Sequence, residues 1–196
     1  MLLAFFFLYQ TYIQNIIYEE RLNQMEEVTH QMFQNLEDVI DSHWNRVMEE
    51  CNYLREANVQ TIDELCKYMK KKYELSAYEE QKITLMAVDS EGRYYTERGN
   101  RGLFRDLDYF EDNPKQISFV FDSMTDNQSE MVFLKRLSKP IQLQNGKKKT
   151  TIRYFGIAQN MEQLNPYFNC DAYDRNNSVY VLDDNGFKLF NSNKVE

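Results

Sequence analysis

The chain has 196 residues, of which 42% are hydrophobic and 14% aromatic, enough to build one medium-sized domain with further segments outside it. Its 6 glycines and 3 prolines are too few for a disordered or low-complexity chain. The net charge of −8 repels phosphate backbones, so a nucleic-acid partner is not expected.

The cysteines and histidines lack the spacing of a zinc site, and no other metal site is expected. His30 and His43 stand 13 positions apart on one predicted helix, too far apart to share a metal ion there. We expect both histidines to face solvent or a neighbouring helix.

Residues 1–18 carry no charge and begin with a continuous apolar run from Leu2 to Tyr9. A bilayer-spanning helix needs about 20 mostly apolar residues, and this segment is slightly shorter and more polar in its second half. It also lacks the basic start and the small-residue cleavage site of a signal peptide. We interpret it as the outer end of a single-pass transmembrane helix whose inner end precedes residue 1, which anchors an extracytoplasmic domain in the cell membrane. A buried amphipathic helix of a soluble protein is the alternative.

Residues 19–57 contain no glycine or proline, and their apolar residues recur at steps of three and four. That spacing is typical of one face of a long helix. One small domain cannot cover such a helix along its whole length. We therefore predict a stalk over 19–60 that pairs with a second copy in a homodimer. A helix packed entirely within one chain is the alternative.

A second helix is expected over 62–74, because Thr61 and Glu64 have the Thr-x-x-Glu spacing of a capping box. Asn58 is the expected break between the two helices. The two segments are then predicted to form an antiparallel hairpin.

Cys51 and Cys66 stand seven and eight residues from Asn58, almost symmetrically about the expected turn. A disulfide between them would staple the two helices outside the cell. Two reduced buried thiols are the alternative, and composition alone does not decide the redox compartment.

The rest of the chain favours short strands separated by glycine-containing turns. Strands are expected at 82–89, 93–96, 117–122, 131–137, 140–143, 150–159, 178–182 and 187–190, and short helices at 103–111 and 161–168. Helices followed by strands in hairpins predict an α+β fold, with a long N-terminal helix and an antiparallel sheet flanked by helices.

Three stretches carry a resemblance to a known family. They are the VDSEGRYY hairpin, the run FLKRLSKPIQLQNGKKKTTIRYFGIAQNMEQL, and the closing YVLDDNGFKLFNSN. Together with the long helix before them, they resemble the double Cache domain, the PAS-like extracellular sensor of bacterial chemoreceptors, sensor histidine kinases and diguanylate cyclases. The resemblance implies a membrane-distal PAS-like sensor over 61–170 and the start of a membrane-proximal unit at 171–196.

The resemblance also implies a ligand pocket in the distal unit, between the sheet and the segments after the first hairpin. Its expected lining is Tyr109, Phe119, Asp122, Phe133, Arg136 and Tyr154. A guanidinium such as that of Arg136 can hold a carboxylate with two hydrogen bonds; a surface position on the strand is the alternative. The family's amino-acid-binding version carries an Arg-x-Trp-Tyr motif, which is absent here, since Trp44 in the stalk is the one tryptophan. The ligand class stays open.

No phosphate-binding glycine loop, HExxH, GxSxG or Cys/His nucleophile pattern is present. We therefore expect no catalysis and no cofactor, and a small molecule or a solute-binding protein as the partner. The alternative is a membrane-anchored interaction module that binds another protein through a dimeric stalk and senses nothing.

Overall fold

The computed structural model of the chain describes residues 2–75, 78, 82–104, 110, 114–122, 129–164, 180–182 and 188–191. It has two α-helices, one short 3-10 helix and eight strands in these ranges. The bounds are α1 Leu2–Glu56, α2 Ile62–Leu75, β1 Ile83–Asp89, β2 Arg93–Thr96, β3 Gly99–Leu103, β4 Gln116–Asp122, β5 Ser129–Asn145, β6 Lys148–Asn160, η1 Met161–Leu164, β7 Tyr180–Leu182 and β8 Lys188–Asn191. The predicted α+β class with a long N-terminal helix is confirmed.

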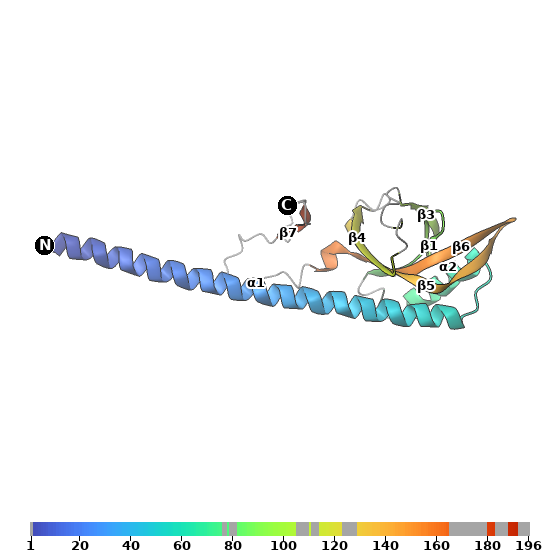
Figure 1. The fold of residues 1–196 in the computed structure, drawn as a ribbon, viewed down its shortest axis with the longest axis horizontal. Helices are drawn as coiled ribbons and strands as arrows, with labels where there is room; N and C mark the ends of the chain where they lie inside the picture. Colours follow the sequence, from blue (N-terminus) through green and yellow to red (C-terminus); the bar gives the residue numbers. More distant parts are fainter. Residues whose placement is uncertain are drawn as a thin grey trace.

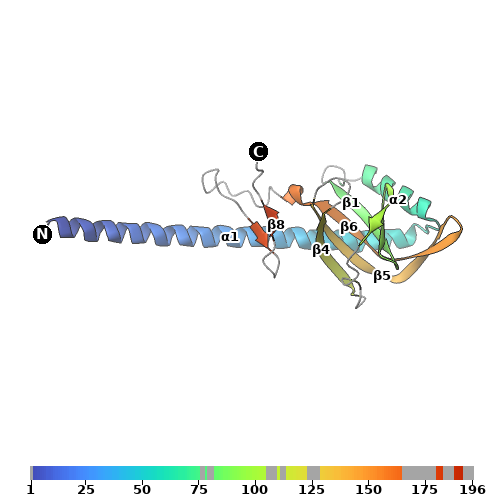
Figure 2. The same ribbon diagram turned by 90° about the horizontal axis from the view of Figure 1, so that it is seen from above.

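The 55-residue helix α1 is about 80 Å long at 1.5 Å per residue. Its C-terminal part packs on the sheet, while its N-terminal part projects well beyond the domain (Figures 1 and 2). Large apolar side chains stay exposed along the projecting part; those described are Phe6, Tyr9, Tyr12, Ile16, Ile17, Tyr18, Leu22, Met25 and Phe33. Among the described residues, no helix contains a stretch long and apolar enough to cross a membrane.

The break between the two helices lies where the sequence predicts it. Asn58 has a φ of 49°, a left-handed conformation that asparagine adopts more easily than most residues. The capping box also forms, because the Glu64 backbone N donates to Thr61 Oγ1 (3.1 Å) and the Thr61 backbone N donates to Glu64 Oε2 (3.3 Å).

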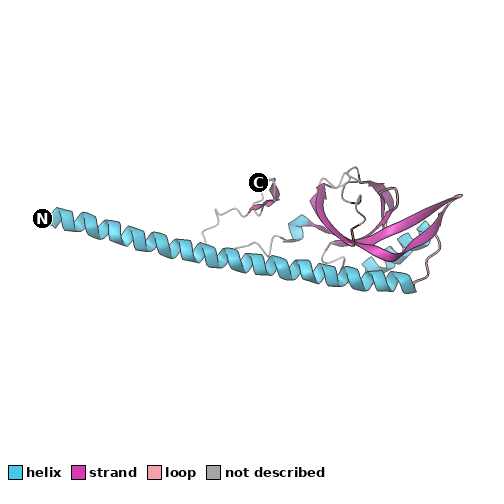
Figure 3. Ribbon diagram, in the orientation of Figure 1, coloured by secondary structure: helices cyan, strands magenta, loops and turns pink. Residues whose placement is uncertain are grey.

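Six strands form one antiparallel sheet in the order β3-β2-β1-β6-β5-β4, and β7 pairs with β8 in a separate hairpin. The sheet is strongly curled, with both helices lying against its outer face (Figure 3). The β1–β2 turn is held by Asp89, whose carboxylate accepts from the backbone N of Glu91 (2.8 Å) and from Arg93 Nε (2.8 Å).

Two strand predictions need correction. Strand β3 was not expected, because its sequence Gly-Asn-Arg-Gly-Leu has neither apolar alternation nor β-branched residues. The strands expected at 131–137 and 140–143 are one strand, β5, which continues through Pro140. Proline fits here because the β5–β6 register shifts between Arg136 and Ile141, where a ladder hydrogen bond is not required. The short helix expected at 103–111 falls largely outside the described residues, and Leu103 belongs to β3.

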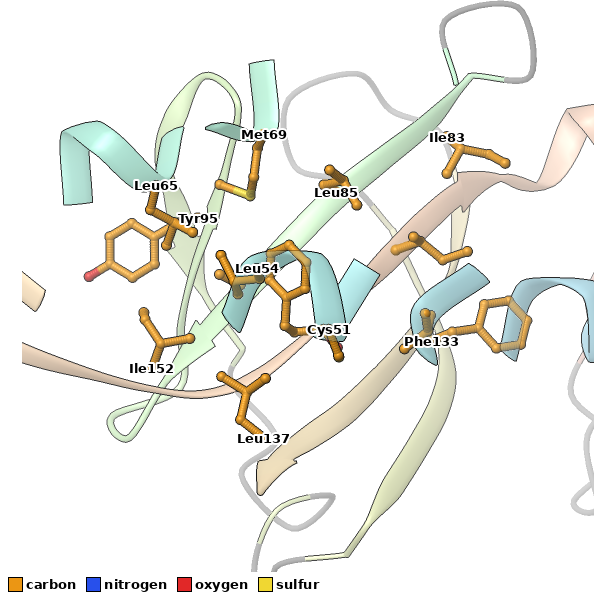
Figure 4. Packing of buried hydrophobic residues seen from close by; sticks show 14 of the residues in the cluster. Cys51, Leu54, Leu65, Met69, Ile83, Leu85, Tyr95, Phe133, Leu137 and Ile152 are labelled. Carbon is orange, nitrogen blue, oxygen red and sulfur yellow. The ribbon is translucent and has the colours of Figure 1, made fainter. Parts of the chain in front are cut away.

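The main core lies between the helices and the outer face of the sheet. Cys51 and Leu54 reach from α1, and Leu65 and Met69 from α2, towards the strands (Figure 4). Cys51 and Cys66 are both free thiols in the structure. The two thiols contact different strands. Cys51 Sγ donates to the Phe155 carbonyl of β6 at 3.7 Å, and the backbone of Gly99 in β3 forms a hydrogen bond with Cys66.

The sequence suggested that His43 faces solvent or a neighbouring helix. His43 lies inside this core instead. It is 6% exposed, its Nε2 bonds the Gln159 side chain, and its ring packs on Phe133 at 5.1 Å between centroids. Burial lowers the pKa of His43 below its ordinary value of 6.5; the bond to Gln159 opposes this shift and the charge of Arg46 adds to it. Between the lowered pKa and about pH 6.5, His43 is therefore neutral in the folded chain and protonated in the unfolded chain.

The free energy of unfolding should consequently fall as the pH drops from about 6.5 towards the lowered pKa of His43 in the folded chain. The contribution of neutral His43 to the free energy of unfolding is fully present above about pH 6.5 and is lost as the pH falls below it. Urea unfolding at several pH values should show this loss in the wild type and in the His30→Gln variant, whose histidine is exposed. His43→Gln should flatten the profile over the same window, and an unchanged profile in that variant would contradict the assignment.

Candidate functional site

The inner face of the sheet, which points away from both helices, carries a second apolar cluster. Its buried members are Met86, Val88, Tyr94, Phe104, Ile117, Val132, Leu134, Tyr154 and Ala158, and the half-buried Phe110 and Phe119 pack against them. The aromatic rings contact one another in sequence: Tyr94 stacks on Phe104 at 4.7 Å, and Phe104 meets Phe119 edge-on at 5.2 Å. We call this cluster the aromatic face.

Tyr154 is a buried polar residue of the aromatic face. It comes from β6, is 2% exposed, and its ring meets Phe110 edge-on at 5.0 Å. The hydroxyl is buried and has no hydrogen-bond partner in the part of the chain that the structure describes. A buried hydroxyl without a partner costs about 1–3 kcal/mol, so it stands out in a folded protein.

The charges of two arginines act on this hydroxyl. Arg136 of β5 is directly opposite Tyr154 in the β5–β6 ladder, so the two side chains share a face of the sheet. Burial raises the pKa of Tyr154, and the positive charges of Arg136 and Arg153 partly oppose that rise. The hydroxyl therefore stays protonated at neutral pH, and Tyr154 can donate a hydrogen bond beside an exposed cation.

The sequence-predicted lining is brought together only in part. Phe119, Arg136 and Tyr154 share the inner side of the sheet. Phe133 lies on the opposite face, fully buried against His43 and Trp44 of α1. The backbone of Asp122 closes β4, but its side chain lies outside the described residues, as does Tyr109 entirely.

Sequence reasoning missed Tyr94, Phe104 and Phe110 as members of this face. Tyr94 follows the Asp-Ser-Glu-Gly turn at a position that alternates with the outward Tyr95, and the alternation of a strand could have separated these two tyrosines. Phe104 lies just beyond β3, a strand that the sequence did not predict.

The side chains of the aromatic face, as far as the structure describes them, include no nucleophile–base pair. The described residues contain no group of three or more His, Cys, Asp or Glu that could hold a metal ion. The chemistry available is apolar and aromatic contact, the buried hydroxyl of Tyr154 and the guanidinium of Arg136 at the rim. Such a combination of apolar walls with a few polar groups is typical of small-molecule sites.

Neither a family model nor a curated protein matches the chain.

Tyr154→Phe should stabilise the ligand-free protein by about 1 kcal/mol, because it removes a buried hydroxyl that has no partner among the described residues. The matched control is Tyr95→Phe, whose hydroxyl donates to Asp89 Oδ2 at 3.2 Å on the other face. That change should destabilise by about 1 kcal/mol. Urea unfolding of both variants checks the opposite signs, and a destabilised Tyr154→Phe would mean that the hydroxyl is already satisfied.

Proposed function

We propose that the chain is the signal-input module of a membrane-bound receptor, a PAS-like, Cache-type sensor domain that binds a small molecule on its aromatic face. The curled antiparallel sheet with helices on one side is compatible with a PAS-like fold. A solute-binding protein is the other partner that the family resemblance suggests. The module performs no catalysis itself, and an output domain such as a histidine kinase or diguanylate cyclase would receive the signal.

One observation carries the proposal: the strands that bear the aromatic face also bear the contact with α1. Tyr154 of β6 faces inward, whereas the next residue, Phe155, faces outward into the core with α1. The carbonyl of Phe155 lies 3.7 Å from Cys51 Sγ on the helix. A ligand that displaces β6 would therefore act on α1 through packed atoms, provided that it binds the two states with different affinity.

The helix would carry the displacement away from the domain. Its projecting part is exposed along Phe6, Tyr9, Tyr12 and neighbouring apolar residues. We propose that residues 1–18 enter a membrane and that the exposed stalk pairs with a second copy, with the sensor domain on the extracytoplasmic side. Tyrosines at the end of a span would suit the interfacial zone.

A thermal-shift screen of metabolites tests ligand binding on the wild type and on Tyr154→Phe in parallel. A ligand that binds only the folded chain stabilises it by RT ln(1 + [L]/Kd), so the melting temperature rises with the logarithm of the ligand concentration above Kd. The proposal predicts at least one compound whose stabilisation is clearly smaller in Tyr154→Phe. Two outcomes would count against the aromatic face as the site. One is a screen without any stabilising compound, and the other is compounds that raise the melting temperature equally in the wild type and in Tyr154→Phe.

The second candidate function is a membrane-anchored interaction module with a dimeric stalk. The observation that favours it is the exposed apolar surface of α1, which is larger than a monomeric soluble helix needs. Analytical ultracentrifugation of the full chain in detergent, together with the ligand screen, would distinguish the two candidate functions. A tight dimer together with a failed ligand screen supports the interaction module, whereas ligand binding supports the sensor.

A further inference from the structure

A surface groove lies on the opposite side of the sheet from the aromatic face. This groove of about 250 Å³ separates the C-terminal end of α1 from β5. Its lining is Cys51, Leu54, Arg55, Asn58, Val59, Leu137, Ser138, Lys139, Pro140 and Ile141. The volume lies just under the range of about 300–1,000 Å³ that is usual for drug-sized ligands, so a fragment-sized molecule fits best.

The groove exists because β5 leaves its ladder at this point. Arg136 pairs with Tyr154 and Ile141 with Ile152, so five residues of β5 advance against two of β6. The extra residues bulge towards the turn at Asn58 that follows α1. The site is therefore built into the β5–β6 register and does not depend on a chance surface rotamer.

The floor of the groove is apolar and its rim is cationic. Leu54 and Leu137 are buried members of the main core, and Ile141 packs against them. The charged residues in the lining are Arg55 and Lys139, both exposed, in a chain whose net charge is −8. One guanidinium nitrogen of Arg55 donates to Ser138 Oγ at 2.9 Å, which holds the side chain across the groove.

The thiol in the floor adds no reactivity. Burial raises the pKa of Cys51 to about 11, although the nearby charges of Lys135 and Arg55 oppose the rise. Glu50 is the nearby anion, but its oxygens already accept from Tyr68, Lys72 and Tyr78. The groove therefore presents apolar contact below and positive charge above.

We propose that this groove binds a small amphipathic carboxylate, with its apolar part on Leu54, Leu137 and Ile141 and its carboxylate between Arg55 and Lys139. The guanidinium retains donors beyond the one used by Ser138, and a carboxylate accepts two of them in parallel. A bound molecule would contact both α1 and β5. The site is separate from the aromatic face, so the proposal stands whether or not that face binds a ligand.

Isothermal titration of the full chain with octanoate, octan-1-ol and octyltrimethylammonium tests the charge requirement. Octanoate should bind with a Kd below about 1 mM, and the alcohol and the cation at least tenfold more weakly. The double variant Arg55→Met/Lys139→Met should weaken octanoate binding at least tenfold. The control Lys147→Met/Lys148→Met removes the same charge from the tip of the β5–β6 hairpin and should leave binding unchanged.

Methyl NMR locates the bound probe. Octanoate should shift the resonances of Leu54, Leu137 and Ile141, and leave those of Met86 and Val88 on the aromatic face unmoved. Absence of octanoate binding overturns the proposal. So do equal affinities for octanoate and octan-1-ol, full affinity in the Arg55→Met/Lys139→Met variant, or shifts confined to the aromatic face. Both substituted side chains are exposed, so the variant should fold, and its melting curve verifies this.

Discussion

Gly156→Ala should destabilise the protein by more than about 3 kcal/mol, and we expect little folded protein at 37 °C. Gly156 lies in β6 opposite Leu134 of β5. A Cβ built there would stand 1.8 Å from the carbonyl oxygen of Phe133 and 2.9 Å from its carbonyl carbon. These are backbone atoms, so no side-chain rotation relieves the overlap and the central strand pair must separate.

Gly146→Ala is the matched control for this prediction. Gly146 lies in the β5–β6 turn with a φ of 59°, and, apart from its chain neighbours, no atom of the described residues stands within 4 Å of an added Cβ. That change carries only the cost of a left-handed alanine, about 1–2 kcal/mol. Thermal unfolding by circular dichroism should show a modest loss for Gly146→Ala and a collapse for Gly156→Ala. Equal losses would mean that β5 and β6 are not packed as closely as described.

Glu50→Ala should be the second large effect, a loss of about 3 kcal/mol in the free energy of unfolding. Glu50 is 4% exposed and accepts from Tyr78 Oη (3.0 Å), Tyr68 Oη (3.2 Å) and Lys72 Nζ (3.2 Å). It therefore ties α1 to α2 and to Tyr78. Alanine removes the acceptor and leaves three donors to find others, which is the costly way to break a buried charged pair.

We expect a loss in the free energy of unfolding at the low end of the range for buried pairs, because the Lys72 side chain is 29% exposed and can turn to water. Burial, and next the charge of Glu50, raise the pKa of both Tyr68 and Tyr78, so both hydroxyls are protonated donors at neutral pH. Urea unfolding of Glu50→Ala against Glu49→Ala, whose side chain is exposed, measures the difference. A loss no larger than that of Glu49→Ala would show that the helices are held by apolar packing alone.

Local signals in the sequence predicted the elements that depend on short-range chemistry. The Thr61–Glu64 capping box, the break at Asn58 and the hairpin around Asp89 each follow from a few neighbouring residues. The antiparallel sheet with helices on one side followed from the order of these elements. The division into a membrane-distal and a membrane-proximal unit remains a prediction.

The candidate site was harder to predict because it depends on which face of a strand each residue occupies. Residues 131–134 are all apolar, so alternation could not place Phe133 towards α1 and its neighbours Val132 and Leu134 towards the aromatic face. The register shift after Arg136 could not be predicted from the sequence either, because it arises from the pairing of β5 with β6. The burial of His43 depends on a partner, Gln159, that lies 116 residues further along the chain.

Hydrogen–deuterium exchange of α1, with and without a ligand found in the thermal-shift screen, tests the central claim most directly. If binding at Tyr154 is transmitted across β6 to Cys51 and its neighbours, amide protection over residues 36–54 should change on binding in the wild type. The same concentration should leave protection unchanged in Tyr154→Phe. A ligand that saturates the aromatic face while every amide of 36–54 exchanges as before would contradict the claim that this domain signals through its helix.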